Sequence, residues 1–211
     1  MPNKHLTAAA VFLLGMATVV AAAGDEQENG SQMKWFVGFG LTHGGDELAE
    51  VELVHDDDSH HDEDIRGGEL ITIAAGIVVY LPLHSWSIQT SIGYHSDEVG
   101  SYNDDIKFDR YPLELIPFYN FKKHRIGAGL SYHLSPELNL KDIGGPKVEF
   151  DDALGWLVEY DHSFSGWEND GFVLGVRYLW IDYEVDKVSN IRRPGIDVDG
   201  NHIGIHVNYM F

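Results

Sequence analysis

The chain has 211 residues, and its 34 Asp and Glu residues outnumber its 14 Lys and Arg residues, which gives a formal net charge of −20 at pH 7. This charge excludes nucleic acid as a partner, because binding to phosphates relies on Lys and Arg side chains. The chain has no Cys, so disulfide bonds cannot stabilise it. No glycine loop of a phosphate-binding pattern occurs, and we expect no cofactor.

The beginning of the chain has the composition of a secretory signal peptide. Lys4 precedes an apolar run over residues 6–20, and small residues follow at positions 21–24. A positive, then apolar, then small-residue order is typical of such peptides, and we predict cleavage after Ala23. The alternative is a membrane anchor, which needs about 20 consecutive apolar residues, more than this run provides.

The rest of the chain contains segments in which apolar and polar residues alternate, the pattern of strands with two different faces. The segments cover residues 33–42, 69–81, 86–95, 109–121, 125–134, 152–162, 171–183 and 202–211. Each reaches the length of about 9 to 11 residues that a tilted membrane strand requires. The connections after the second, fourth and sixth segments are short and the others long and polar, which predicts periplasmic turns and extracellular loops.

The last segment separates its two faces most clearly. One face carries Ile203, Ile205, Val207, Tyr209 and Phe211, and the other carries His202, Gly204, His206, Asn208 and Met210. One face therefore suits lipid and the other a polar interior. In the other segments Trp and Tyr gather near the ends, as the interfacial girdles of a membrane barrel require. The alternative, a soluble sandwich or lipocalin-like barrel, would be filled with charge.

These patterns predict an all-β protein, an eight-stranded antiparallel up-and-down transmembrane β-barrel. We expect a monomer in the cell outer membrane, surrounded by outer-membrane lipids and lipopolysaccharide. The predicted organisation is a signal peptide over residues 1–23, a periplasmic segment over residues 24–32 and the barrel over residues 33–211.

The terminal aromatic Phe211 resembles the C-terminal signature of bacterial outer-membrane β-barrel proteins. With the alternating strands and charged inner faces, residues 33–211 resemble the small OmpA-like eight-stranded outer-membrane β-barrel superfamily, and residues 108–119 and 124–134 are similar to hairpins of its members. The resemblance implies the fold. It leaves the function open, because members include adhesins, envelope-stability proteins, small-molecule passages and lipid-modifying enzymes.

The inner faces carry charges that a narrow barrel can hold only in pairs. An eight-stranded barrel is just wide enough for side chains to fill it, and an unpaired buried charge costs several kcal/mol. We predict an interior charge network of Arg110, Glu114, Glu159 and Arg177 that holds the barrel closed. The alternative role is a narrow conduit for protons or ions.

One pair of residues suggests catalysis. His133 and Ser135 are two positions apart in a predicted strand, so they would share a face, and the imidazole could activate the hydroxyl. The pair resembles the His-x-Ser of outer-membrane lipid A deacylases, which implies a lipid A-modifying hydrolase. Pro136 stands where those enzymes have Asn, and only Glu137 or Glu149 could serve as the acid.

The first long loop is the candidate metal site. It carries His55, His60, His61 and Asp62 among six carboxylates in ten residues. Imidazoles and carboxylates bind zinc, and carboxylates bind calcium, so the loop could capture a divalent cation. The alternative is a solvated acidic loop without a site. We therefore expect a non-enzymatic barrel in envelope integrity or surface interaction, with a hydrolase or a cation-binding surface protein as alternatives.

Overall fold

The computed structural model describes residues 32–54, 60–66, 70–81, 85–101, 104–140, 145–192 and 195–211. Within these ranges no helix is long and apolar enough to cross a membrane. The strands are β1 (Gln32–Gly44), β2 (Glu47–Val54), β3 (His60–Arg66), β4 (Leu70–Tyr80), β5 (Trp86–Ser101), β6 (Asp104–Phe121), β7 (His124–Asn139), β8 (Lys147–Phe150), β9 (Ala153–Ser163), β10 (Gly171–Trp180), β11 (Asp182–Val188), β12 (Ile191–Arg192), β13 (Asp197–Asp199) and β14 (His202–Met210).

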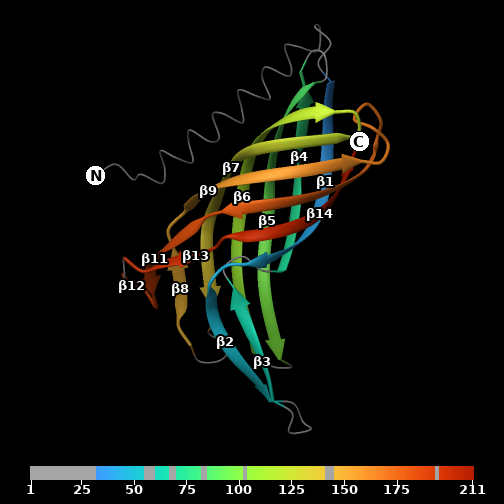
Figure 1. Ribbon diagram of the computed structural model, residues 1–211. Helices are drawn as coiled ribbons and strands as arrows, with labels where there is room; N and C mark the ends of the chain where they lie inside the picture. The colour runs from blue at the N-terminus through green and yellow to red at the C-terminus, as the bar shows by residue number, and fades with distance from the viewer. Residues whose placement is uncertain are drawn as a thin grey trace, which may run out of the picture.

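Eight of these strands form a closed antiparallel barrel (Figure 1). Its order is β1, β4, β5, β6, β7, β9, β10 and β14, and β14 pairs again with β1. Closure removes the free edges of the sheet, so the backbone N–H and C=O groups find partners between neighbouring strands. The predicted eight-stranded antiparallel barrel is confirmed.

The strand boundaries differ from the prediction at one end of the barrel. β5, β6 and β7 have 16, 18 and 16 residues, longer than the alternating segments predicted for them. The predicted seventh strand divides into β10 and β11, because β10 pairs with β9 only as far as Trp180, and β11 pairs with β8 and β13. Backbone pairing continues beyond the point where the outward residues cease to be apolar, and the alternation therefore underestimates these strands.

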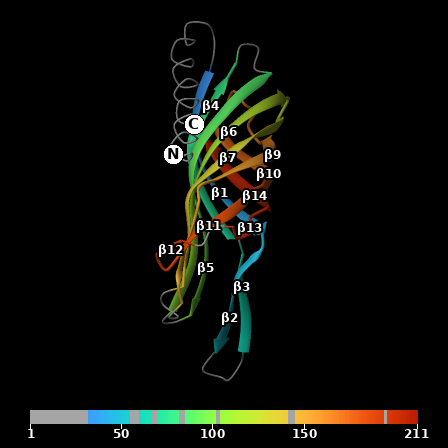
Figure 2. The ribbon, with the colours of Figure 1, turned by 90° about the vertical axis from the view of Figure 1, so that its left-hand side faces the viewer.

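The longer strands lead into additional structure at the end of the barrel that carries the long connections, here called the long-loop end. β8, β11, β12 and β13 form a small sheet there, joined to the barrel through β7. The β2–β3 hairpin projects beyond the barrel at the same end (Figure 2). The opposite end, here called the short-turn end, is closed by short connections near the C-terminus. The two ends therefore differ in how much structure they present.

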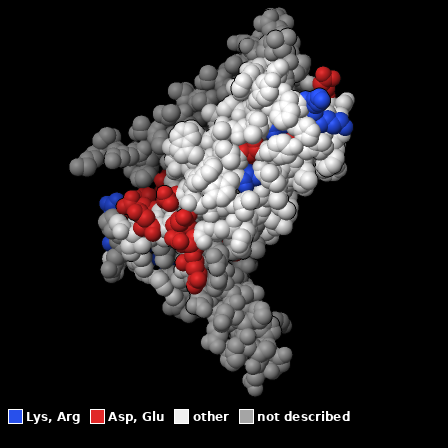
Figure 3. Space-filling model, in the orientation of Figure 1, with Lys and Arg blue, Asp and Glu red and all other residues white. Residues whose placement is uncertain are grey.

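The outer face of the barrel is apolar. Large hydrophobic side chains are about half exposed along every barrel strand, and aromatic rings stand near the strand ends, including Trp35, Trp86, Tyr119, Trp156, Phe172 and Trp180. On the face in Figure 3 the surface between the two ends is mostly uncharged, and Asp and Glu gather at the long-loop end. An apolar belt between aromatic rings fits the hydrocarbon layer of a membrane.

The interior is filled by side chains. Phe36, Tyr80, Trp167 and Met210 belong to an apolar cluster at the short-turn end. Phe108, Phe150 and Tyr183 pack edge to face toward the long-loop end, with ring centroids 5.6 to 6.1 Å apart. Buried polar and charged residues lie between these apolar clusters. This arrangement agrees with the narrow bore expected of eight strands.

The apolar belt leads to a test of membrane orientation. Val176 faces outward midway between the rings of Phe172 and Trp180, and a Val176→Lys substitution should lower the free energy of unfolding in lipid by about 2 to 4 kcal/mol. Ile196→Lys, at a similarly exposed apolar residue of the long-loop end, should have little effect. Urea unfolding in lipid vesicles measures both, and equal effects would contradict the position of the belt.

Candidate functional site

Arg177 of β10 lies at the centre of the interior charge network. Its Nη1 and Nη2 donate to the two carboxylate oxygens of Glu114 at 3.0 and 2.9 Å. Its Nε and Nη2 also donate to Glu159 Oε2, at 2.9 and 2.5 Å. Ser91 and Ser131 donate their hydroxyls to Glu114 at 3.3 and 3.4 Å. One guanidinium therefore joins two carboxylates from β6 and β9 across the inside of the barrel.

A second ion pair lies nearer the short-turn end. Arg125 of β7 donates from Nε to Asp161 Oδ2 of β9 at 2.7 Å, and its Nη2 lies 2.6 Å from the same oxygen in an ion pair. Its Nη2 also donates to Gln89 Oε1 at 2.6 Å. The guanidinium lies 4.0 Å from the ring centroid of Phe118 and 4.9 Å from that of Trp167. The Arg125–Asp161 pair is fully buried and hydrogen-bonded, which is the condition for a buried ion pair to persist.

The structure brings together three of the four residues in the expected network, Glu114, Glu159 and Arg177. Arg110 lies apart from them, with its Nη2 at 3.0 Å from His95 Nε2 and its guanidinium 4.7 Å from the ring centroid of Phe108. The expected network did not include the Arg125–Asp161 pair. The alternation of polar and apolar residues places both side chains on the inner face. That they meet is decided by the strand register, in which Arg125 lies opposite Asp161.

Histidines form a further polar layer toward the long-loop end. Thr42 Oγ1 and His95 Nε2 are 2.8 Å apart, and the rings of His95 and His202 meet edge to face with centroids 5.2 Å apart. His133 Nδ1 lies 2.7 Å from the Tyr183 hydroxyl, and its Nε2 lies 3.1 Å from Ser131 Oγ. This layer lies between the charge network and the aromatic cluster of Phe108, Phe150 and Tyr183.

The expectation that His133 and Ser135 share a strand face is wrong. The register of β7 against β6 shifts at this point, and Ser135 has a φ of 48°, in the left-handed region. His133 is buried inside the barrel, whereas Ser135 is exposed outside it. The candidate acids are also engaged elsewhere, since Glu137 pairs with Lys147, and Glu149 pairs with Lys147 and Lys187. The geometry therefore gives no support to the hydrolase.

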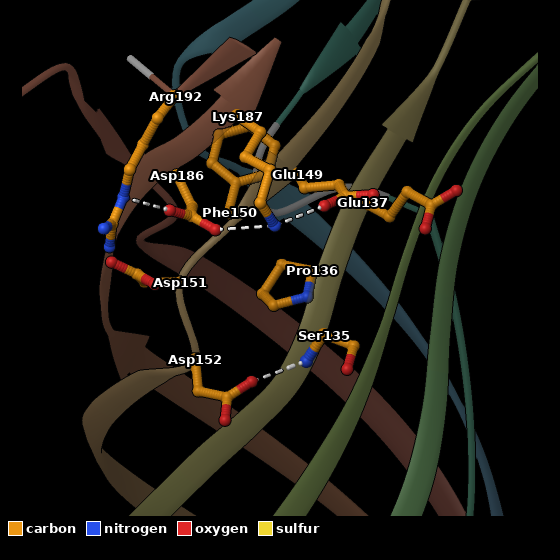
Figure 4. A pocket seen from close by; sticks show the side chains of 10 residues that line it. All are labelled: Ser135, Pro136, Glu137, Glu149, Phe150, Asp151, Asp152, Asp186, Lys187 and Arg192. Carbon is orange, nitrogen blue, oxygen red and sulfur yellow. Dashed lines mark hydrogen bonds and ion pairs between the residues drawn. The ribbon is translucent and has the colours of Figure 1, made fainter. Parts of the chain in front are cut away.

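Ser135 instead lines a cleft of about 590 Å³ at the long-loop end (Figure 4). Its backbone N–H donates to Asp152 Oδ1 at 2.9 Å. On the other wall, Lys187 lies 2.9 Å from both Asp186 and Glu149, and Arg192 lies 3.1 Å from Asp186. The hydrogen bonds from Lys187 and Lys147 lower the pKa of Glu149, and the hydrogen bond from Lys187 lowers the pKa of Asp186. The cleft is thus a partly solvated, mostly acidic surface.

The candidate metal residues of the first long loop are only partly placed. His60, His61 and Asp62 lie in β3, where their backbones pair with Val54, Leu53 and Glu52 of β2. Their side chains and the whole of His55 lie outside what the structure describes. A cation site in this loop stays a prediction.

Comparisons with known proteins add no function. No protein-family model matches the sequence, and no curated protein matches it. The crystal structure of Neisserial surface protein A is similar with a TM-score of 0.42 and 10% identity, over 86% of this chain and 99% of that chain. The structure of Pseudomonas aeruginosa OpdK with vanillate matches with a TM-score of 0.13 and 10% identity, over 87% and 99% of the two chains.

The charge network should contribute strongly to stability. An Arg177→Met substitution leaves Glu114 and Glu159 buried without their shared cation, and we expect a loss of about 3 to 5 kcal/mol in the free energy of unfolding. The matched control is Arg192→Met, which removes an ion pair whose Arg side chain is 76% exposed, and it should cost about 0 to 1 kcal/mol. Urea unfolding followed by tryptophan fluorescence distinguishes the two, and similar losses would contradict the network.

The ion pairs of the cleft predict a pH dependence. Because the folded pKa of Glu149 is lowered from the ordinary 4.5, its stabilising contribution is present above that value and is lost as the pH falls through the folded pKa. In Lys187→Met the pKa of Glu149 should rise back toward 4.5, since its first hydrogen-bond donor is gone. Carboxyl carbon NMR titration measures the shift, with Lys123→Met at the short-turn end as the control. An unchanged pKa of Glu149 in Lys187→Met would contradict the pairing.

Proposed function

We propose that the protein is an integral outer-membrane barrel that has no transport pathway and acts at the cell surface, where its acidic long-loop end contacts cationic partners. The observation that carries the proposal is the filled interior. Apolar side chains at the short-turn end, two ion-pair groups and a histidine layer occupy successive levels of the bore. A barrel without a continuous bore can interact with its surroundings only through its outer surfaces.

The location in the outer membrane rests on the outer face. Exposed apolar side chains such as Ile73, Ile92, Val158 and Ile205 would be costly in water, and a membrane relieves that cost. The backbone of the barrel is compatible with lipid because its ladder is closed. The long-loop end would then face outward from the cell and the short turns inward, as in membrane barrels of this class.

The choice of surface interaction rests on the contrast between the two ends. The short-turn end offers tight connections, whereas the long-loop end carries a second small sheet and the β2–β3 hairpin. Exposed carboxylates are gathered there, namely Asp46, Glu47, Asp182, Glu184 and Asp197 (Figure 3). Such a surface attracts cationic partners and divalent cations through its field.

The experiment uses the full barrel in nanodiscs of zwitterionic lipid and a lysine decapeptide as the cationic probe. Binding should occur at about 10 mM salt and weaken at about 0.15 M, because the Debye length falls from about 30 Å to about 8 Å. Glu184→Lys at the long-loop end should weaken binding several-fold, and Glu168→Lys at the short-turn end should not. Biolayer interferometry gives the affinities.

Three results would overturn the proposal. Equal loss of binding in Glu184→Lys and Glu168→Lys would show that the long-loop end is not the contact surface. Discrete conductance steps of the wild-type protein in a planar bilayer would show that the interior is open. A loss of lipid A acyl chains that depends on Ser135 would instead establish the hydrolase.

A further inference from the structure

Three side chains of the interior converge on one point. Glu159 and Asp161 come from β9, and His206 comes from β14. The imidazole Nε2 of His206 lies 3.0 Å from Asp161 Oδ1 and 3.5 Å from Glu159 Oε1. The three prospective ligand atoms all lie within 4.8 Å of one another. All three residues are buried.

Gly175 makes this convergence possible. It lies on β10, between β9 and β14, and its register partners are Asp161 on one side and His206 on the other. A Cβ atom at position 175 would collide with Asp161 Oδ1 and with the His206 ring. Because Gly175 has no side chain, residues of two strands that do not pair with each other meet across the strand that separates them.

Each carboxylate is held by an arginine through one oxygen and presents the other to the same point. Asp161 Oδ2 accepts from Arg125, and Glu159 Oε2 accepts from Arg177, which leaves Asp161 Oδ1 and Glu159 Oε1 facing His206. Glu159 Oε1 is buried and has no hydrogen-bond partner among the described residues. Outer partners that orient ligand side chains in this way are typical of metal sites.

A small cavity adjoins the cluster. Its volume is about 30 Å³, and its lining includes Glu159, His206, Gln89 and Asn208. That volume is enough for a water molecule, which needs roughly 10 to 15 Å³ of accessible space and polar partners. A metal ion bound by the three side chains could therefore take a water molecule in this cavity as an additional oxygen ligand.

The charge of the layer favours a cation. Three carboxylates, Glu114, Glu159 and Asp161, face two guanidinium groups, Arg125 and Arg177, which leaves one negative charge in excess when His206 is neutral, the form of imidazole that binds a metal. An excess charge in a buried layer is costly unless a counter-charge is present. A zinc ion with a hydroxide at its fourth position would bring the sum to zero.

We propose that the barrel binds one zinc ion through His206 Nε2, Glu159 Oε1 and Asp161 Oδ1. Zinc bonds of about 2.0 to 2.1 Å to nitrogen and oxygen place tetrahedral ligands about 3.3 to 3.4 Å apart, close to the observed 3.0 and 3.5 Å. The ion links β9 to β14 across β10 and so stabilises the last three strands of the barrel. This site is separate from the histidine-rich first loop and from the acidic surface proposed to bind partners.

The test measures metal in the full-length barrel refolded from urea into detergent with Zn²⁺, or with Co²⁺ as a spectroscopic substitute. We expect about one ion per chain, visible d–d absorption of tetrahedral Co²⁺, and a higher unfolding temperature with Zn²⁺ than with EDTA. His206→Gln should lower the bound metal at least tenfold. Two control variants should retain it: His202→Gln on the same strand, and the double variant His60→Gln with His61→Gln in the first loop.

The outcomes are separable even if His206→Gln does not fold. Wild-type barrel that binds no metal and gives no Co²⁺ absorption after refolding would overturn the proposal without any variant. Metal retained by a folded His206→Gln, or lost in the double variant of the first loop, would also overturn it by placing the ion elsewhere. Asp161→Asn, which keeps a side chain able to accept from Arg125, provides a second ligand variant with the same expected loss.

Discussion

Closure of the backbone ladder between the first and last barrel strands is the constraint on which the rest of the structure depends. It extends to the last residue, because Trp35 and Phe211 exchange both backbone hydrogen bonds at 2.9 and 3.0 Å. In hydrocarbon an open edge would leave these groups without partners, at a cost of several kcal/mol for each. Closure with eight strands also fixes a bore that side chains fill, and it thereby sets the chemistry of the interior.

The narrow bore explains why the buried charges occur as linked groups. Arg177 and Arg125 each bind a carboxylate from β9, and these two carboxylates lie two residues apart on the same inner face. Such pairs contribute stability only when both partners are present. Gly175 gives Asp161 and His206 room to meet beside the pairs, so a position without a side chain shapes the polar interior as much as the charged residues do.

The same closure directs interactions to the two ends of the barrel, and these differ. At the short-turn end, Trp167 packs into the apolar cluster and against the Arg125 guanidinium. At the long-loop end the strands continue past the apolar belt into a second sheet with exposed carboxylates and a cleft. The proposed contact surface thus lies at the long-loop end, whereas the proposed zinc site lies in the barrel interior, where it would contribute to stability.

The sequence by itself determined the strands, their two faces and the closed barrel, because side-chain alternation is a local property of extended backbone, and closing the ladder gives the backbone groups of every barrel strand a partner. It also placed Glu114, Glu159 and Arg177 inside. Only the tertiary structure decided that Arg125 meets Asp161, that His206 joins Glu159 and Asp161, and that Ser135 turns away from His133. Those outcomes depend on strand register, on closure and on one left-handed residue, which are relations between distant segments or backbone angles that alternation does not encode.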